Sequence, residues 1–151
     1  MIKLNDACLL IYQCAFWGCG LEEIDLNNVE TLGGRSGGGY DRGAFRKCTQ
    51  LRKVIGWNLK KISAMSFMEC NSLKSIYLNR IESISSEAIS KCTSLEYIYC
   101  KATTPPAISS DTFKGNNSTW VWYVPDESVE IYKSATNYGN LRIKPISEFA
   151  E

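Results

Sequence analysis

Three cysteines at a constant interval constrain the fold of this chain more than any other feature. Cys48, Cys70 and Cys92 follow one another at intervals of 22 residues, and each lies in the same phrase, which ends in leucine. The phrase occupies residues 44–51, 66–73 and 88–95, and a copy one residue shorter occupies residues 15–21. A fixed period of this length is typical of repeat proteins, in which each unit stacks on the next. The spacing therefore predicts a solenoid.

Each phrase is followed by the pattern of a short strand. Apolar residues alternate after the leucine, as at Ile76 and Leu78 in one copy, and only Gly56 weakens the pattern. A second apolar pair follows in three copies: Val29 and Leu32, Leu59 and Ile62, Ile81 and Ile84. One such unit cannot bury its apolar side alone, so neighbouring units must share a core. We predict a β-rich solenoid of roughly 22-residue units, with short strands and tight or short helical turns.

The phrase also resembles a known family. The pattern Ala-Phe-x-x-Cys-Thr-Ser-Leu-x-x-Ile-x-Leu, with residues 102–108 and 123–133 near the C-terminus, is similar to the BspA-like leucine-rich repeats of Bacteroides-type bacterial surface proteins. The resemblance spans nearly the whole chain and implies a right-handed coil, an adhesive role and a place at the cell surface or in secretion. We expect one domain, residues 1–151. Residues 1–101 would form repeats with a glycine-rich insertion at 33–43, and residues 102–151 the last repeat and a C-terminal cap.

Residues between the apolar positions of each strand should face outward, because side chains alternate across a strand. One outward column contains Lys3, Asp25, Ile55, Tyr77, Tyr99 and Tyr123, and the other contains Glu23, Lys53, Ser75, Tyr97 and Val121. Tyrosine offers a partner broad apolar contact and a polar tip. We therefore predict a partner-binding concave face made of Tyr77, Tyr97, Tyr99, Tyr123, Lys53 and Ile55. The alternative is that the rings stabilise the sheet through cross-strand packing and bind nothing.

The composition argues against catalysis and against highly charged partners. The chain has no histidine, and 17 lysines and arginines against 16 acidic residues leave a net charge of +1. Histidine is the commonest general base and metal ligand, and a nearly neutral chain attracts neither nucleic acid nor an anionic membrane. We predict no enzyme activity, cofactor, metal site or nucleic-acid partner. The repeated cysteines are interpreted as buried core residues.

The insertion at residues 33–43 suggests two functional interpretations, and both are weak. It is rich in glycine like a phosphate-binding loop, but it lacks the Gly-Lys-Ser/Thr ending. Arg35, Tyr40 and Arg42 resemble a short RNA-binding segment, although the chain around them is nearly neutral. The stretch from Leu32 to Phe45 is eight residues longer than its counterparts. We expect a surface loop that bulges from one edge of the coil and can serve in contacts.

The two ends of the chain lead to different expectations. Residues 2–4 lie 22 positions before residues 24–26, so Met1 falls inside a repeat and the first strand should have an unpaired edge. This predicts either a fragment of a longer repeat protein or a homo-oligomer that pairs this edge. At the other end, Asp126 is predicted to cap a short helix that closes the stack. The sequence shows no signal peptide and no apolar run of membrane-spanning length.

These observations favour a non-enzymatic recognition or adhesion module, which binds a protein or glycan through the concave repeat face. The alternative is an architectural spacer, or a fragment of a longer surface repeat protein, without a ligand site of its own. An enzyme or nucleic-acid binder that uses the glycine-rich loop fits least, because no catalytic constellation or basic patch accompanies the loop.

Overall fold

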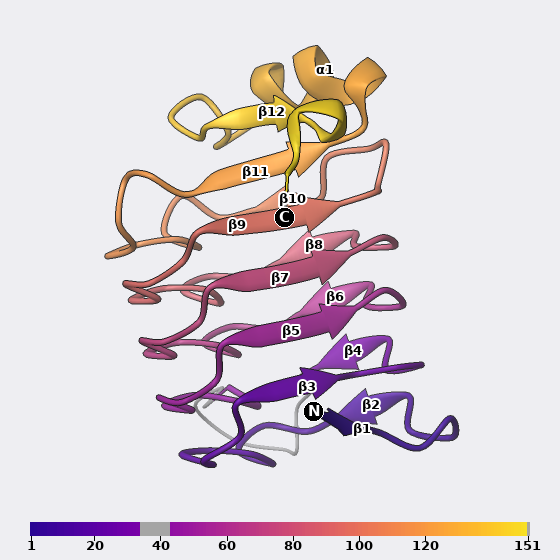
Figure 1. The fold of residues 1–151 in the computed structure, drawn as a ribbon, viewed down its shortest axis with the longest axis vertical. Coiled ribbons are helices and arrows are strands. Elements are labelled where there is room, and N and C mark those ends of the chain that lie inside the picture. Colours follow the sequence, from indigo (N-terminus) through magenta and orange to yellow (C-terminus); the bar gives the residue numbers. More distant parts are fainter. Residues whose placement is uncertain (34–42, 151) are drawn as a thin grey trace.

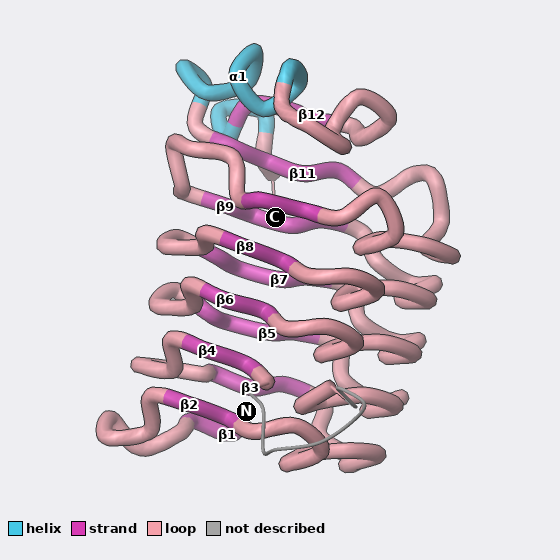
Figure 2. Tube along the Cα trace, turned by 180° about the vertical axis from the view of Figure 1, so that it is seen from behind, coloured by secondary structure: helices cyan, strands magenta, loops and turns pink. Residues whose placement is uncertain are grey.

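The computed structural model describes residues 1–33 and 43–150, which form a stack of coil turns with two parallel sheets (Figure 1). Within these residues the front sheet has the spatial order β1 (Ile2–Lys3), β3 (Glu23–Asp25), β5 (Lys53–Gly56), β7 (Ser75–Leu78), β9 (Tyr97–Cys100), β11 (Val121–Val124) and β12 (Ile143–Pro145). The back sheet is made of β2 (Leu10–Ile11), β4 (Thr31–Leu32), β6 (Lys61–Ile62), β8 (Ser83–Ile84) and β10 (Ala107–Ile108) (Figure 2). Three short helical segments lie near the C-terminus: η1 (Asp126–Ser128), α1 (Val129–Ser134) and η2 (Ile146–Glu148).

The strand register follows the sequence period. Ser75 of β7 pairs with Tyr97 of β9, 22 positions later, and Lys53 of β5 pairs with Ser75 at the same interval. Glu23 of β3 pairs with Lys53, which is 30 positions later. The eight extra residues predicted from the sequence therefore fall between β3 and β5. They leave the pairing of these two strands intact. Most of the insertion, residues 34–42, lies outside the described residues.

The core lies between the two sheets and is filled by the residues that repeat. Ile24, Val54, Ile76, Ile98 and Trp122 point inward from the front sheet with no exposed surface. The phrase residues Phe16, Phe45 and Phe67 stack from turn to turn, with ring centroids 4.9 and 5.4 Å apart. Like residues thus contact like residues along the stack. This packing gives a continuous core that no single turn could form.

The second apolar pair of each repeat leads into the back sheet. Leu32, Ile62 and Ile84 are buried there, and the neighbouring Thr31, Lys61 and Ser83 are more exposed. These strands are only two residues long, so their apolar pattern is too short to reveal a strand from the sequence. The sequence predicted the buried positions. The second sheet itself becomes visible only in the structure.

The cysteines of the phrase form a column inside the turns. Cys48, Cys70 and Cys92 have no exposed surface, and their thiols donate to the carbonyl oxygens of Phe16, Phe45 and Phe67 at 2.9, 3.1 and 3.2 Å. Burial raises the pKa of Cys48 to about 11 and that of Cys92 to about 12. Each thiol therefore links one turn to the preceding one as a neutral hydrogen-bond donor. The interpretation of these cysteines as core residues is confirmed.

Gly56 breaks the apolar pattern of β5 because a neighbouring side chain fills its place. It pairs with Leu78 of β7, whose side chain points into the core. A Cβ atom at Gly56 would lie 2.5 Å from Cδ1 of Leu59. Leu59 thus occupies the space that a residue at position 56 would otherwise take, and the core stays filled.

The C-terminal segment closes one end of the stack. Tyr132 of α1 is fully buried, and its hydroxyl donates to the carbonyl oxygens of Ala102 and Thr104 at 2.9 and 3.3 Å. The predicted cap by Asp126 is wrong, because η1 has no side-chain cap and the Asp126 carboxylate accepts the backbone N–H of Ser147 at 3.1 Å. This bond requires β12 and η2 to fold back beside η1, a long-range contact that no local pattern predicts.

Candidate functional site

The outward face of the front sheet carries the predicted columns in register. Ile55, Tyr77, Tyr99 and Tyr123 are successive partners along β5, β7, β9 and β11. Lys53, Ser75, Tyr97 and Val121 are successive partners in the second column. The structure therefore brings all six predicted partner-binding residues onto one face. Their role in binding stays a prediction.

Three of the tyrosines contact one another directly. The hydroxyl groups of Tyr77 and Tyr97 are 2.7 Å apart and share a hydrogen bond, and their rings meet edge to face with centroids 5.9 Å apart. The rings of Tyr77 and Tyr99 are 5.8 Å apart. Only 7% of Tyr77 is exposed, whereas Tyr97, Tyr99 and Tyr123 are half-buried. The surface that these rings offer to a partner comes mainly from Tyr97, Tyr99 and Tyr123.

Two further aromatic rings, which were not predicted, contact these tyrosines. Trp57 meets Tyr77 and Tyr99 edge to face, with centroids 5.6 and 6.3 Å apart. The alternation of outward positions 53 and 55 leads to position 57, one residue beyond the end of β5, so this signal was present in the sequence. Phe149, near the C-terminus, contacts Tyr97, Tyr99 and Tyr123. No spacing rule places it there. We call Trp57, Tyr77, Tyr97, Tyr99 and Tyr123 the aromatic cluster, and Phe149 packs on it.

Lysines border the aromatic cluster. Nζ of Lys53 lies 5.0 Å from the ring centroid of Tyr77, and Nζ of Lys101 lies 5.1 Å from that of Trp57. A cation over an aromatic face is held by the electrostatic field of the ring. The predicted site residue Lys53 is therefore already engaged within the chain. Towards β1 the outward residues are charged instead, with Glu23 and Asp25 on β3.

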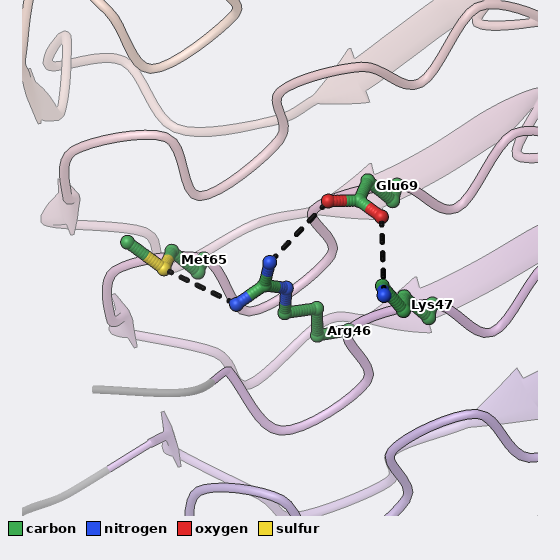
Figure 3. A network of polar contacts seen from close by, with 4 residues as sticks. All are labelled: Arg46, Lys47, Met65 and Glu69. Atoms are coloured by element: carbon green, nitrogen blue, oxygen red, sulfur yellow. Dashed lines mark hydrogen bonds and ion pairs between the residues drawn. The ribbon is translucent and has the colours of Figure 1, made fainter. Parts of the chain in front are cut away.

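A separate polar network lies on the turns beside the sheets (Figure 3). Arg46 reaches from one turn to Glu69 in the next at 3.3 Å, and Lys47 contacts the same carboxylate at 3.8 Å. The guanidinium group also contacts the sulfur of Met65 at 3.9 Å and lies 5.4 Å from the ring centroid of Trp17. These contacts pair opposite charges between neighbouring turns. Each of these groups thus has its partner within the chain.

The described residues offer neither a metal site nor a membrane-spanning helix. Residues 1–33 and 43–150 contain no group of three or more Cys, Asp or Glu side chains that could hold a metal ion. In the same part of the chain, no helix is long and apolar enough to cross a membrane. Arg35, Tyr40 and Arg42 of the insertion lie outside the described residues.

The edge of the stack at β1 and β2 carries apolar side chains. In the described structure β1 and β2 are the outermost strands of the two sheets at the same end. Ile2 is 47% exposed and Leu10 is 37% exposed, and the other large exposed apolar residues here are Met1, Leu9, Tyr12 and Trp17. Among the described residues, β1 pairs on one side only, with β3.

Two parallel sheets, whose central strands pair at the 22-residue interval, define this chain as a solenoid repeat protein. A family model described as the BspA type leucine-rich repeat region matches residues 39–147 in six copies. The match covers more than half of the chain, which therefore belongs to the BspA-type leucine-rich-repeat family. The strands β1 to β4 lie before the matched residues and continue the same two sheets. No curated protein matches the chain.

Proposed function

We propose that the chain is a non-enzymatic recognition module, which binds a protein or glycan partner at the cell surface through the aromatic cluster of the front sheet. The observation that carries this proposal is the position of the rings. The core is complete without them, because Ile76, Ile98 and Trp122 fill the inner face of the same strands. Half-buried tyrosines on a rigid sheet are suited to contact with a partner, since they lose little side-chain entropy on binding.

The location and the absence of catalysis are parts of the same proposal. Membership in the BspA-type family supports a surface location, because the repeats resemble those of bacterial surface proteins. The thiols of the repeats are protonated donors, and Arg46 and Lys47 both pair with Glu69. These groups are structural, which favours binding over chemistry.

The test is a binding screen of the chain against extracellular-matrix proteins and a glycan array, by biolayer interferometry. The site variant combines Tyr99→Ser with Tyr123→Ser, and leaves Tyr77 unchanged because that ring is buried. The matched control is Lys61→Ser on the back sheet, on the opposite side of the coil. We expect the site variant to lose binding and the control to keep it, with the circular dichroism of both unchanged. Equal binding by parent and site variant would contradict the proposal.

An architectural role is the second candidate, and one observation favours it. The hydroxyl groups of Tyr77 and Tyr97 share a hydrogen bond, and their rings pack edge to face. Such contacts are expected of rings that stabilise a sheet by cross-strand packing. In that case no partner binds to the face in the screen. The Tyr99→Ser and Tyr123→Ser changes would then lower only the free energy of unfolding.

A further inference from the structure

The C-terminal segment lies across the aromatic cluster. After β12 the chain turns through η2 and descends in front of β11 towards β9 (Figure 1). The ring centroid of Phe149 is 5.0 Å from those of Tyr97, Tyr99 and Tyr123, at interplanar angles of 63°, 60° and 67°. One phenyl ring is thus held edge to face by three tyrosines from two neighbouring strands. This arrangement is favourable for aromatic pairs.

The remaining contacts of this segment are few and exposed. Lys144 and Glu148 form an ion pair at 2.9 Å, with 42% and 53% of their side chains exposed. The backbone N–H of Ser147 donates to Asp126 at an exposed position. Exposed ion pairs contribute little to stability, because water and salt screen them. The apolar contacts of the segment therefore come from Phe149 and from Ile146 of η2, which are both half-buried.

The stack does not depend on this segment for closure. Trp122, Tyr132 and Tyr138 are fully buried under α1 and the loop that follows it. Phe149, by contrast, is only half-buried. The segment covers the outward face of the sheet and is not part of the core. It occupies the surface that the proposed function assigns to a partner.

We propose that Tyr97, Tyr99 and Tyr123 form a binding site for an aromatic side chain that follows an acidic residue in a peptide segment of a partner protein, and that Phe149 is the intramolecular occupant of this site. The proposal rests on the proposed recognition function and specifies its ligand. Lys144 supplies the positive charge for an acidic residue beside the aromatic one, as it does for Glu148. A sugar ring stacks flat on an aromatic face. The edge-to-face angles of 60° to 67° suit a phenyl ring better.

The tether makes the segment an effective competitor. A ligand on a short linker acts at an effective concentration in the millimolar range. A free peptide of similar affinity must reach that concentration to displace Phe149. The parent chain should therefore bind such peptides much more weakly than a chain in which a small polar residue replaces Phe149.

The experiment uses the full chain with Phe149→Ser and a blocked peptide of residues 145–150, followed by ¹H–¹⁵N NMR. The peptide should bind the variant saturably and shift the amides of Tyr97, Tyr99 and Tyr123. The peptide should bind the parent chain with an apparent affinity at least roughly tenfold lower than its affinity for Phe149→Ser. Phe149→Tyr, which keeps a ring in place, should behave as the parent does. A peptide with serine in place of phenylalanine is the ligand control, and Phe149→Ser combined with Tyr99→Ser is the site control.

The proposal is overturned if the two peptides bind alike, if parent and Phe149→Ser bind the peptide equally, or if the peptide does not bind. It is also overturned if neutral oligosaccharides shift these amides and the peptide does not, because the site would then belong to a glycan. Peptide binding to Phe149→Ser, without any partner for that same unmasked variant in the matrix screen, would refute the proposed function and leave this site standing. The two proposals can therefore fail separately.

Discussion

The repeated cysteines occupy the same enclosed place in each turn. Each thiol donates to a carbonyl oxygen of the preceding turn, so the proton takes part in the structure. Removal of water disfavours the thiolate and raises the pKa of Cys70 and Cys92. Reactivity depends on the thiolate. These residues should therefore be chemically inert while the chain is folded.

Thiol alkylation tests this expectation. The pKa of Cys92 is raised from 9.0 to about 12, which lowers its thiolate fraction at pH 8 about a thousandfold. With iodoacetamide at pH 8 we expect the partly exposed Cys8, Cys14 and Cys19 to be labelled first, and Cys70 and Cys92 only after unfolding. Mass spectrometry of digested peptides measures both groups, and labelling in urea is the control. Rapid labelling of Cys70 in the folded chain would contradict the prediction.

Replacement of Gly43 by even the small residue alanine should strongly lower the free energy of unfolding. Gly43 has a φ of +67°, and an added Cβ would lie 1.9 Å from the carbonyl oxygen of Met65, a rigid backbone atom. We expect Gly43→Ala to lower the free energy of unfolding by about 2 kcal/mol or more, from strain and displacement of the backbone. Urea unfolding measures the change. Gly139→Ala is the matched control, since a Cβ there meets nothing within 4 Å. Equal stability of the two variants would refute the argument.

At the scale of elements, α1 closes the stack through Tyr132. Its ring lies against Trp122 and Tyr138, and its hydroxyl serves two carbonyl groups of the segment between β9 and β10. Short helices of this kind derive their stability from packing and not from their own hydrogen bonds. The stability of the cap should therefore depend on the hydrogen bonds of the Tyr132 hydroxyl.

Tyr132→Phe should lower the free energy of unfolding by about 1 kcal/mol, because two partly buried carbonyl groups lose their donor while the ring still fills its place. Thermal and urea unfolding followed by circular dichroism measure the effect. The control is Tyr12→Phe, at a tyrosine that is 55% exposed, which should change stability by less than about 0.5 kcal/mol. A neutral Tyr132→Phe change would show that water replaces the hydroxyl.

At the scale of the whole molecule, the two ends of the stack differ. α1 lies against β12 at one end (Figure 1), and at the other end β1 and β2 are the outermost described strands and carry exposed apolar side chains. Unpaired edges bind other strands unless charge or proline blocks them. A twofold axis between two copies makes their β1 strands antiparallel, and strands also pair in that orientation.

We therefore expect this chain to self-associate through the edge of β1 and β2. Sedimentation velocity over a range of concentrations should show a reversible dimer. Ile2→Lys combined with Leu10→Lys should weaken it at least about tenfold, because edge lysines resist pairing. Ile131→Lys, at an exposed position on α1, is the control and should leave association unchanged. A monomer at every concentration, or an unaffected double variant, would refute this expectation.

Much of the front sheet could be predicted from the sequence. The outward columns, the inward position of Trp122 and the eight extra residues between β3 and β5 follow from a period of 22 and a side-chain alternation of two. The back sheet was missed because two-residue strands carry no periodicity. Trp57 was missed because it lies just beyond its strand, and the cap by Asp126 failed because a distant N–H binds its carboxylate.

The sequence by itself determined the repeat, the core positions and the columns of the front sheet, because each depends on local spacing that recurs in every turn. Only the tertiary structure decided how much of the outward face of that sheet is exposed to solvent. The low exposure of Tyr77 arises from neighbours on β5 and β9 and from Trp57 just beyond β5. Phe149 reaches the tyrosines because β12 and η2 reverse the chain over the sheet. The contact joins residues about 25 to 50 positions apart, outside the repeat. Such a contact depends on the completed surface, which local patterns do not encode.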